Sequence, residues 1–157
     1  MHKNPNQPIG IFDSGIGGLT VANAIHHFLP NERLIYFGDT VHLPYGDKSA
    51  DAIRYYCLRI SKFLLEQDCK MIVIACNSAS SAAYDMLLDF FEGKVLFVNV
   101  VDPLVQAVVS EGYKNVGFAH FNYINPMPKN TEEILSKFKK ILVCELNSGQ
   151  FASILKI

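Results

Sequence analysis

The sequence predicts an α/β fold with a mostly parallel sheet and helices on both faces, and three observations lead to that prediction. Short apolar runs alternate with longer stretches whose apolar residues recur every three or four positions. The run at 71–75 is apolar throughout, which is typical of a parallel strand buried on both faces. Polar segments follow directly after several runs, as expected where the strands of such a sheet end.

The first elements can be placed in order along the chain. An apolar strand is expected at 8–12 and a helix at 19–28, with a glycine-rich turn between them. Pro30 and Asn31 end that helix. A second strand follows at 33–37.

The next segments continue the same alternation. A loop at 38–48 leads into an amphipathic helix at 49–66, and the strand at 71–75 leads into a helix at 78–91. The remaining expected elements are a strand at 95–98, a helix at 103–111, the start of a fifth strand at 115–118, a helix at 131–138 capped by Asn130 or Thr131, a strand at 140–144 and a helix at 150–155.

Composition and charge exclude several classes of protein. The 157 residues are 50% hydrophobic and 18% charged, which indicates a globular chain rather than a disordered one. The net charge is −1, so electrostatics give no reason to expect binding to nucleic acid or to an anionic membrane. Residues 1–8 carry no apolar signal region, and no apolar run approaches the ~20 residues that span a bilayer. We therefore expect a cytoplasmic protein.

Three polar segments, 13–15, 38–39 and 76–78, each follow an expected strand. Ligands of parallel α/β sheets gather where strands reach their carboxyl ends, so these segments are expected to converge on one site.

The cysteines are the first candidates for functional residues at this site. The chain has Cys57, Cys69, Cys76 and Cys144, with none of the two-residue spacings of a zinc or redox pair, so no metal site is expected. Cys76 ends one strand and precedes a helix, where backbone N–H groups and the helix dipole stabilise a thiolate. The alternative is a buried structural cysteine. Beside it, the amide and hydroxyls of Asn77, Ser78, Ser80 and Ser81 suit an amino-acid carboxylate.

The glycine-rich turn at 13–18 is the second candidate for a functional segment. Its glycine spacing is not the dinucleotide fingerprint, and it lacks the lysine of a P-loop. Asp13 or Ser14 either caps the following helix or takes part in chemistry, and the residues alone leave both open. The segment 44–46 by itself indicates only a turn.

Together these segments resemble the glutamate racemase family over residues ~7–117. The matching motifs are Gly10 to Leu19, Tyr36-Phe37-Gly38-Asp39 with Pro44-Tyr45-Gly46, and Ala75 to Ser80, in the family's order and spacing. The family usually has threonines where Ser78 and Ser80 stand. The resemblance implies an isomerase that uses two thiols and no cofactor to interconvert L- and D-glutamate for peptidoglycan and the bacterial cell wall. It implies that Cys76 and Asp13 are catalytic, that Ser14, Pro44, Tyr45, Gly46, Asn77 and Ser78 bind glutamate, and that a homodimer is a possible assembly.

The resemblance does not extend to a second catalytic thiol. In the family that thiol lies in a second α/β half, in a Cys-Thr-His context, which this sequence lacks. Cys144 precedes Glu145, Cys57 lies within a helix, and Cys69 precedes a strand rather than following one. We therefore expect this chain alone to be inactive. The alternative function is an inactive or ligand-binding fragment with half a site.

The last residues, ~118–157, instead resemble the C-terminus of the alpha subunit of 2-oxoglutarate–ferredoxin oxidoreductase. The segments that carry this resemblance are 119–126, 128–130 and 144–150. No thiamine- or cluster-binding motif accompanies them. The expected organisation is a racemase-like domain at 1–117 joined to an α/β tail at 118–157, and the alternative is a divergent racemase tail.

Overall fold

The computed structural model describes residues 4–110, 129–138 and 141 of the chain. The chain forms two compact units, Met1–His120 and Phe121–Ile157, and each is described by itself. Among the described residues, no helix has the length and apolar character needed to cross a membrane.

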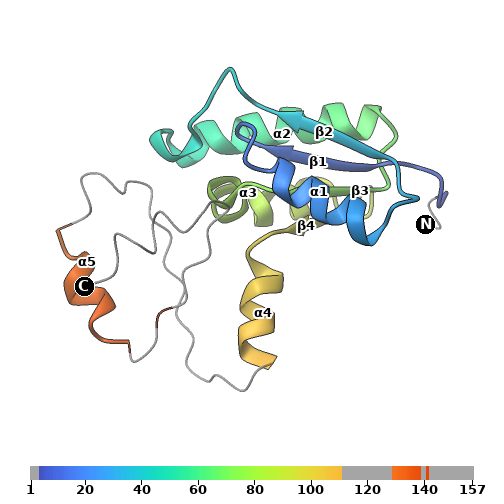
Figure 1. Ribbon diagram of the computed structural model, residues 1–157. Coiled ribbons are helices and arrows are strands. Elements are labelled where there is room, and N and C mark those ends of the chain that lie inside the picture. The colour runs from blue at the N-terminus through green and yellow to red at the C-terminus, as the bar shows by residue number, and fades with distance from the viewer. Residues whose placement is uncertain (1–3, 111–128, 139–140, 142–157) are drawn as a thin grey trace. The chain divides into compact units, whose positions relative to one another are not determined.

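The first unit is built on a four-stranded parallel sheet with the order β2-β1-β3-β4 (Figure 1). The strands are β1 (Ile9–Asp13), β2 (Leu34–Gly38), β3 (Met71–Ile74) and β4 (Leu96–Asn99). Every residue of β1 is buried, because this strand has a neighbour on each side and helices above and below. The α/β fold with a parallel sheet, predicted from the sequence, is confirmed.

Helices cover both faces of this sheet, as predicted. The helix α1 (Leu19–Phe28) packs on one face, where its Val21, Ala22 and Ile25 meet the apolar cluster formed by β1 and β3. The helices α2 (Ala50–Glu66) and α3 (Asn77–Phe90) pack on the other face and against each other (Figure 1). The larger core lies on this second face.

The helix α2 shows how the spacing of apolar residues and a capping residue determine a helix. Its buried residues Ile53, Cys57, Ile60 and Leu64 follow at steps of four, three and four, so they form one stripe. Ser49 caps the helix, and its side chain accepts a hydrogen bond from the Ala52 N–H at 3.2 Å.

The strand order creates a switch point between β1 and β3. The chain passes from β1 to β2 on one side, then returns to place β3 on the other side of β1. In doubly wound sheets, ligands bind outside the carboxyl ends of the strands at such a switch point.

Two segments differ from the expectation. The loop at 38–48 contains a short 3₁₀ helix, η1 (Tyr45–Asp47). In the second unit, α5 is Thr131–Leu135 rather than 131–138. It ends early because the N–H groups of Lys137 and Phe138 bond to carbonyls three residues back rather than four.

The helix α5 has no side-chain cap bond from Asn130. The helix α4 is Asp102–Ser110, close to its expected range. The expected elements at 115–118, 140–144 and 150–155, and Cys144, lie outside the described residues.

Candidate active site

The segments after β1, β2 and β3 meet at the carboxyl edge of the sheet. The Asp39 N–H donates to the Asp13 carbonyl at 2.9 Å, which joins the segments after β2 and β1. The Ala75 N–H donates to the Phe12 carbonyl at 2.8 Å, which joins β3 to β1. The polar residues that follow each strand in the sequence are thus neighbours in space.

Cys76 lies at the centre of this edge, at the N-cap of α3. Its side chain is 6% exposed. The thiol donates a hydrogen bond to the hydroxyl of Ser14, with 3.6 Å between the sulfur and the oxygen. This contact spans the switch point between β1 and β3, and it links two residues 62 positions apart in the sequence.

Burial and hydrogen bonds act on this thiol in opposite directions. Burial raises the pKa of Cys76 above its ordinary 9.0, and the charge of Asp13 raises it further. Hydrogen bonds from the backbone of Ala79 and from the hydroxyl and backbone of Ser14 lower that pKa. The donors expected from the sequence are therefore present, and burial, which has the largest effect, leaves the pKa of the Cys76 thiol above its ordinary value.

Asp13 organises the turn that leads into α1. Its carboxylate accepts hydrogen bonds from the N–H groups of Gly15 and Gly18, both at 3.1 Å. Gly18 is the N-cap of α1, and this helix has no side-chain capping hydrogen bond, so Asp13 holds the turn that precedes the helix. The charge of Asp13 also reaches Cys76, whose pKa it raises.

Two glycines allow the segments to approach this closely. A Cβ on Gly18 would lie 2.7 Å from the Cβ of Asp13, and a Cβ on Gly38 would lie 2.4 Å from the carbonyl oxygen of Gly15. Any side chain at these positions would push the turn away from β2 or Asp13.

Asp39 holds a second cluster beside the site. Its buried carboxylate accepts a hydrogen bond from the Tyr45 hydroxyl at 2.7 Å and contacts His42 Nδ1 at 2.8 Å. The His42 ring stacks on Tyr56 of α2, with 4.0 Å between ring centroids. Tyr45 is 1% exposed, and burial followed by the hydrogen bond to Asp39 raises its pKa.

The residues expected to bind a substrate therefore differ in their exposure to solvent. Pro44 is exposed, and Ser14, Gly46, Asn77 and Ser78 are half-buried. The Tyr45 phenol is instead directed to Asp39.

Ser80, which the sequence grouped with possible ligand groups, has a buried hydroxyl that donates to the Cys76 carbonyl at 2.8 Å. Ser81 of that group is exposed.

The sequence missed one titratable neighbour of the site. Cys57 of α2 is fully buried in the same core cluster as Cys76 and Tyr45. Burial raises its pKa, and the charges of Cys76 and Asp39 raise it further, so this thiol lies within electrostatic reach of both groups. The sequence placed Cys57 in a helix, away from the strand-end segments. Only its place in the buried stripe of α2 indicated that it would face the core.

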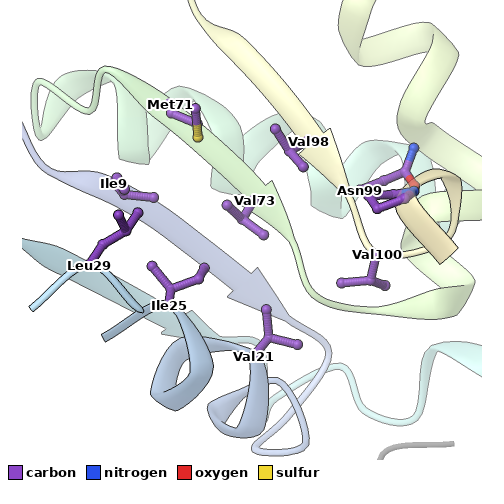
Figure 2. A pocket seen from close by; sticks show the side chains of 10 residues that line it. Ile9, Val21, Ile25, Leu29, Met71, Val73, Val98, Asn99 and Val100 are labelled. Atoms are coloured by element: carbon purple, nitrogen blue, oxygen red, sulfur yellow. The ribbon is translucent and has the colours of Figure 1, made fainter. Parts of the chain in front are cut away.

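An apolar groove of about 400 Å³ lies on the other face of the sheet (Figure 2). Its labelled walls are apolar side chains from α1, β1, β3, β4 and the residues that directly follow α1 and β4, together with the amide of Asn99. The Asn99 side chain is already bonded to Asp102 and to the N–H of Val101. The groove therefore offers no charged side chain to a charged amino acid. No group of three or more His, Cys, Asp or Glu residues in the described part of the chain could hold a metal ion.

Known proteins share both the sequence and the fold of this region. The chain is 46% identical over 115 residues to a glutamate racemase of Thermus thermophilus, and 52% identical over 105 residues to a glutamate racemase of Corynebacterium diphtheriae. These matches cover 73% and 67% of the chain. The chain is a homologue of glutamate racemases. The resemblance read from the sequence is confirmed over that part of the chain.

Solved racemase structures agree with this result. The crystal structure of the Thermus thermophilus glutamate racemase in complex with β-chloro-D-alanine matches with a TM-score of 0.66 at 46% identity, over 71% of this chain and 42% of that one. The Francisella tularensis glutamate racemase in complex with D-glutamate matches with a TM-score of 0.64 at 42% identity, over 67% and 40%.

The racemase homology covers only part of the length of the related racemases. The chain spans about two fifths of the length of the curated racemases it matches, namely 43% and 39% of the two named above. No protein-family model matches the chain.

Proposed function

We propose that this chain carries the first half of a glutamate racemase site, in which Cys76 exchanges a proton with the α-carbon of glutamate. The observation that carries the proposal is the contact between Cys76 and Ser14 at the switch point of a racemase-like sheet. The homology to glutamate racemases selects the substrate class, and one solved relative binds D-glutamate.

In the proposed reaction the Cys76 thiolate removes the α-proton, so the S–H bond forms as the C–H bond breaks and the electron pair stays on the substrate. The raised pKa of the buried thiol favours this direction, because a more basic thiolate is a stronger proton acceptor. Ser14, Asn77 and Ser78 hold the amino acid, together with the segment 44–46. Asp13 positions the Ser14 turn, and on the resemblance to glutamate racemases we propose that it assists Cys76 in catalysis.

Inversion needs an acid on the opposite face of the carbanion. We propose that this chain alone does not provide that acid, so it returns the proton to the same face. The proposed setting is the cytoplasm of a bacterium, where the whole racemase would supply D-glutamate for peptidoglycan. A junction near residue 117, followed by a tail related to an oxidoreductase subunit, is part of the same proposal.

The test is to incubate the protein with L-glutamate in heavy water and to measure deuterium at the α-carbon and D-glutamate separately. We expect slow deuterium uptake with retained configuration, and we expect Cys76→Ala to abolish it. Cys69→Ala is the matched control, because Cys69 is also buried but precedes β3 at the opposite end of the strand.

Two other outcomes would overturn parts of the proposal. D-glutamate production that depends on Cys76 would show that a second acid exists in this chain. If neither product forms, the alternative of a ligand-binding fragment is favoured, and calorimetric titration with D-glutamate would then decide whether the half-site binds at all.

A further inference from the structure

The side chain of Tyr36 reaches the site from β2. Tyr36 pairs with Ile11 in the register of β1 and β2, and its ring belongs to the sheet face that α1 covers. Its hydroxyl donates to the carbonyl of Gly15 at 2.9 Å. A Cβ on Gly18 would lie 3.2 Å from that hydroxyl, so the phenol fills the space under the turn.

The Gly15 residue is thereby fixed on both sides. Its N–H donates to the Asp13 carboxylate at 3.1 Å, and its carbonyl accepts from Tyr36. On the other side of Ser14, the Asp13 carbonyl accepts from the Asp39 N–H. Ser14 is therefore held between two anchored residues, and its hydroxyl is directed at the sulfur of Cys76.

We propose that Tyr36 is a positioning residue, which fixes the Gly15 carbonyl and so keeps the hydroxyl and N–H of Ser14 directed at the Cys76 sulfur. The inference rests on the proposed function, because it matters for catalysis only if Cys76 is the proton-transfer group. Tyr36 acts through the turn and does not itself contact the substrate.

The phenol keeps its proton over the range in which it must donate. Burial, followed by the charges of Asp13 and Cys76, raises the pKa of Tyr36 to about 12. It therefore remains a donor above its ordinary pKa of 10.0. The titratable groups that face Cys76 from the surrounding elements are Asp13 on β1, Tyr36 on β2, Tyr45 on η1 and Cys57 on α2.

Removing the hydroxyl should weaken the Ser14 donors while leaving the fold intact. Tyr36→Phe keeps the ring that packs on the sheet and removes one part-buried hydrogen bond, which is a small part of a domain's stability. The Gly15 carbonyl is then free to rotate, and Ser14 can leave the thiol. A thiolate with fewer donors is less stable, so the pKa of Cys76 should rise further.

The experiment is the pH profile of iodoacetamide alkylation, followed at the Cys76 peptide by mass spectrometry. The variants are Tyr36→Phe, Ser14→Ala and their combination. Tyr84→Phe on α3 is the matched control, because it removes a phenol from the helix that carries Cys76.

We expect Tyr36→Phe and Ser14→Ala each to raise the alkylation midpoint by about 0.5 to 1 pH unit, which is about a threefold to tenfold loss of thiolate at neutral pH. The combination should shift it by less than the sum, because both substitutions remove the same support. Tyr84→Phe should leave the midpoint unchanged.

The pH midpoint of Cys76 alkylation distinguishes a positioning role of Tyr36 from a general structural role. A looser turn would instead expose Cys76, which would relieve the burial that raises its pKa, lower the alkylation midpoint and speed alkylation. That outcome, or a shift for Ser14→Ala with none for Tyr36→Phe, would overturn the inference.

The heavy-water experiment tests the proposed function separately from the inference. A shifted midpoint in a protein without Cys76-dependent exchange would retain the positioning role and reject the proposed function.

Discussion

At the scale of single residues, the site depends on how polar groups are paired when they are buried. Cys76 and Asp13 are both 6% exposed; the Cys76 thiol donates to the Ser14 hydroxyl, and the Asp13 carboxylate accepts from the N–H groups of the following turn. Asp39 is 7% exposed and accepts from Tyr45 and contacts His42. The sequence indicated that the segments 13–15, 38–39 and 76–78 would lie near one edge, but it did not indicate that Asp39 would accept a hydrogen bond from the Tyr45 phenol.

Tyr45→Phe tests that pairing. The substitution keeps the buried ring and removes a 2.7 Å hydrogen bond to a buried carboxylate, so it should lower the free energy of unfolding by about 1–3 kcal/mol. Urea unfolding followed by circular dichroism measures the change. Tyr55→Phe is the control, because Tyr55 is 56% exposed, and it should change stability little. Equal effects from the two substitutions would show that the Asp39 bond does not stabilise the fold.

At the scale of elements, most ranges could be predicted because they follow from periodicity and from glycine and proline. The bounds of α1 were predicted as observed, and those of α2 and α3 within one residue. The segment 38–48 was predicted as a loop, and the 3₁₀ turn of η1 within it was missed. That turn depends on the contact of Tyr45 with Asp39 and the core, which no local pattern shows.

Gly38→Ala tests the close approach of β2 to the turn before α1. The new Cβ would meet the Gly15 carbonyl oxygen at 2.4 Å, and a backbone atom cannot move aside cheaply. The substitution should destabilise the protein by about 1–3 kcal/mol in urea unfolding.

The control is Gly17→Ala, whose Cβ would lie 3.7 Å from the Asp13 carboxylate in ordinary contact. It should be neutral or stabilising, because alanine restricts the unfolded chain. If Gly38→Ala is tolerated equally well, the turn is not held as closely as described.

At the scale of the whole first unit, the core contains several acids that are buried in their protonated form. Burial raises the pKa values of Cys57, Cys76, Tyr36 and Tyr45. The ordinary values are 9.0 for the thiols and 10.0 for the phenols, so the unfolded chain releases these protons at lower pH than the native protein does. Stability from these groups is fully present below about pH 9 and is lost as the pH rises.

We therefore expect the free energy of unfolding to be flat between pH 7 and 8 and to fall between pH 9 and 10.5. Urea unfolding in a reducing buffer at each pH measures this. Cys57→Ala should flatten the fall between pH 9 and 10.5, because it removes one of the buried thiols, even if it lowers stability at pH 7. A pH-independent free energy up to 10.5 would contradict the burial of these groups.

The sequence by itself determined the order of strands and helices, the racemase resemblance and the three polar segments that follow strands. These features depend on local periodicity, on turn residues and on motif spacing, which the chain carries in its linear order. The tertiary structure alone decided that burial outweighs the thiolate donors at Cys76, that Cys57 lies within electrostatic reach, and that Tyr36 anchors the Ser14 turn. Each of these depends on the distance between residues far apart in the sequence and on their exclusion from water, and packing sets both.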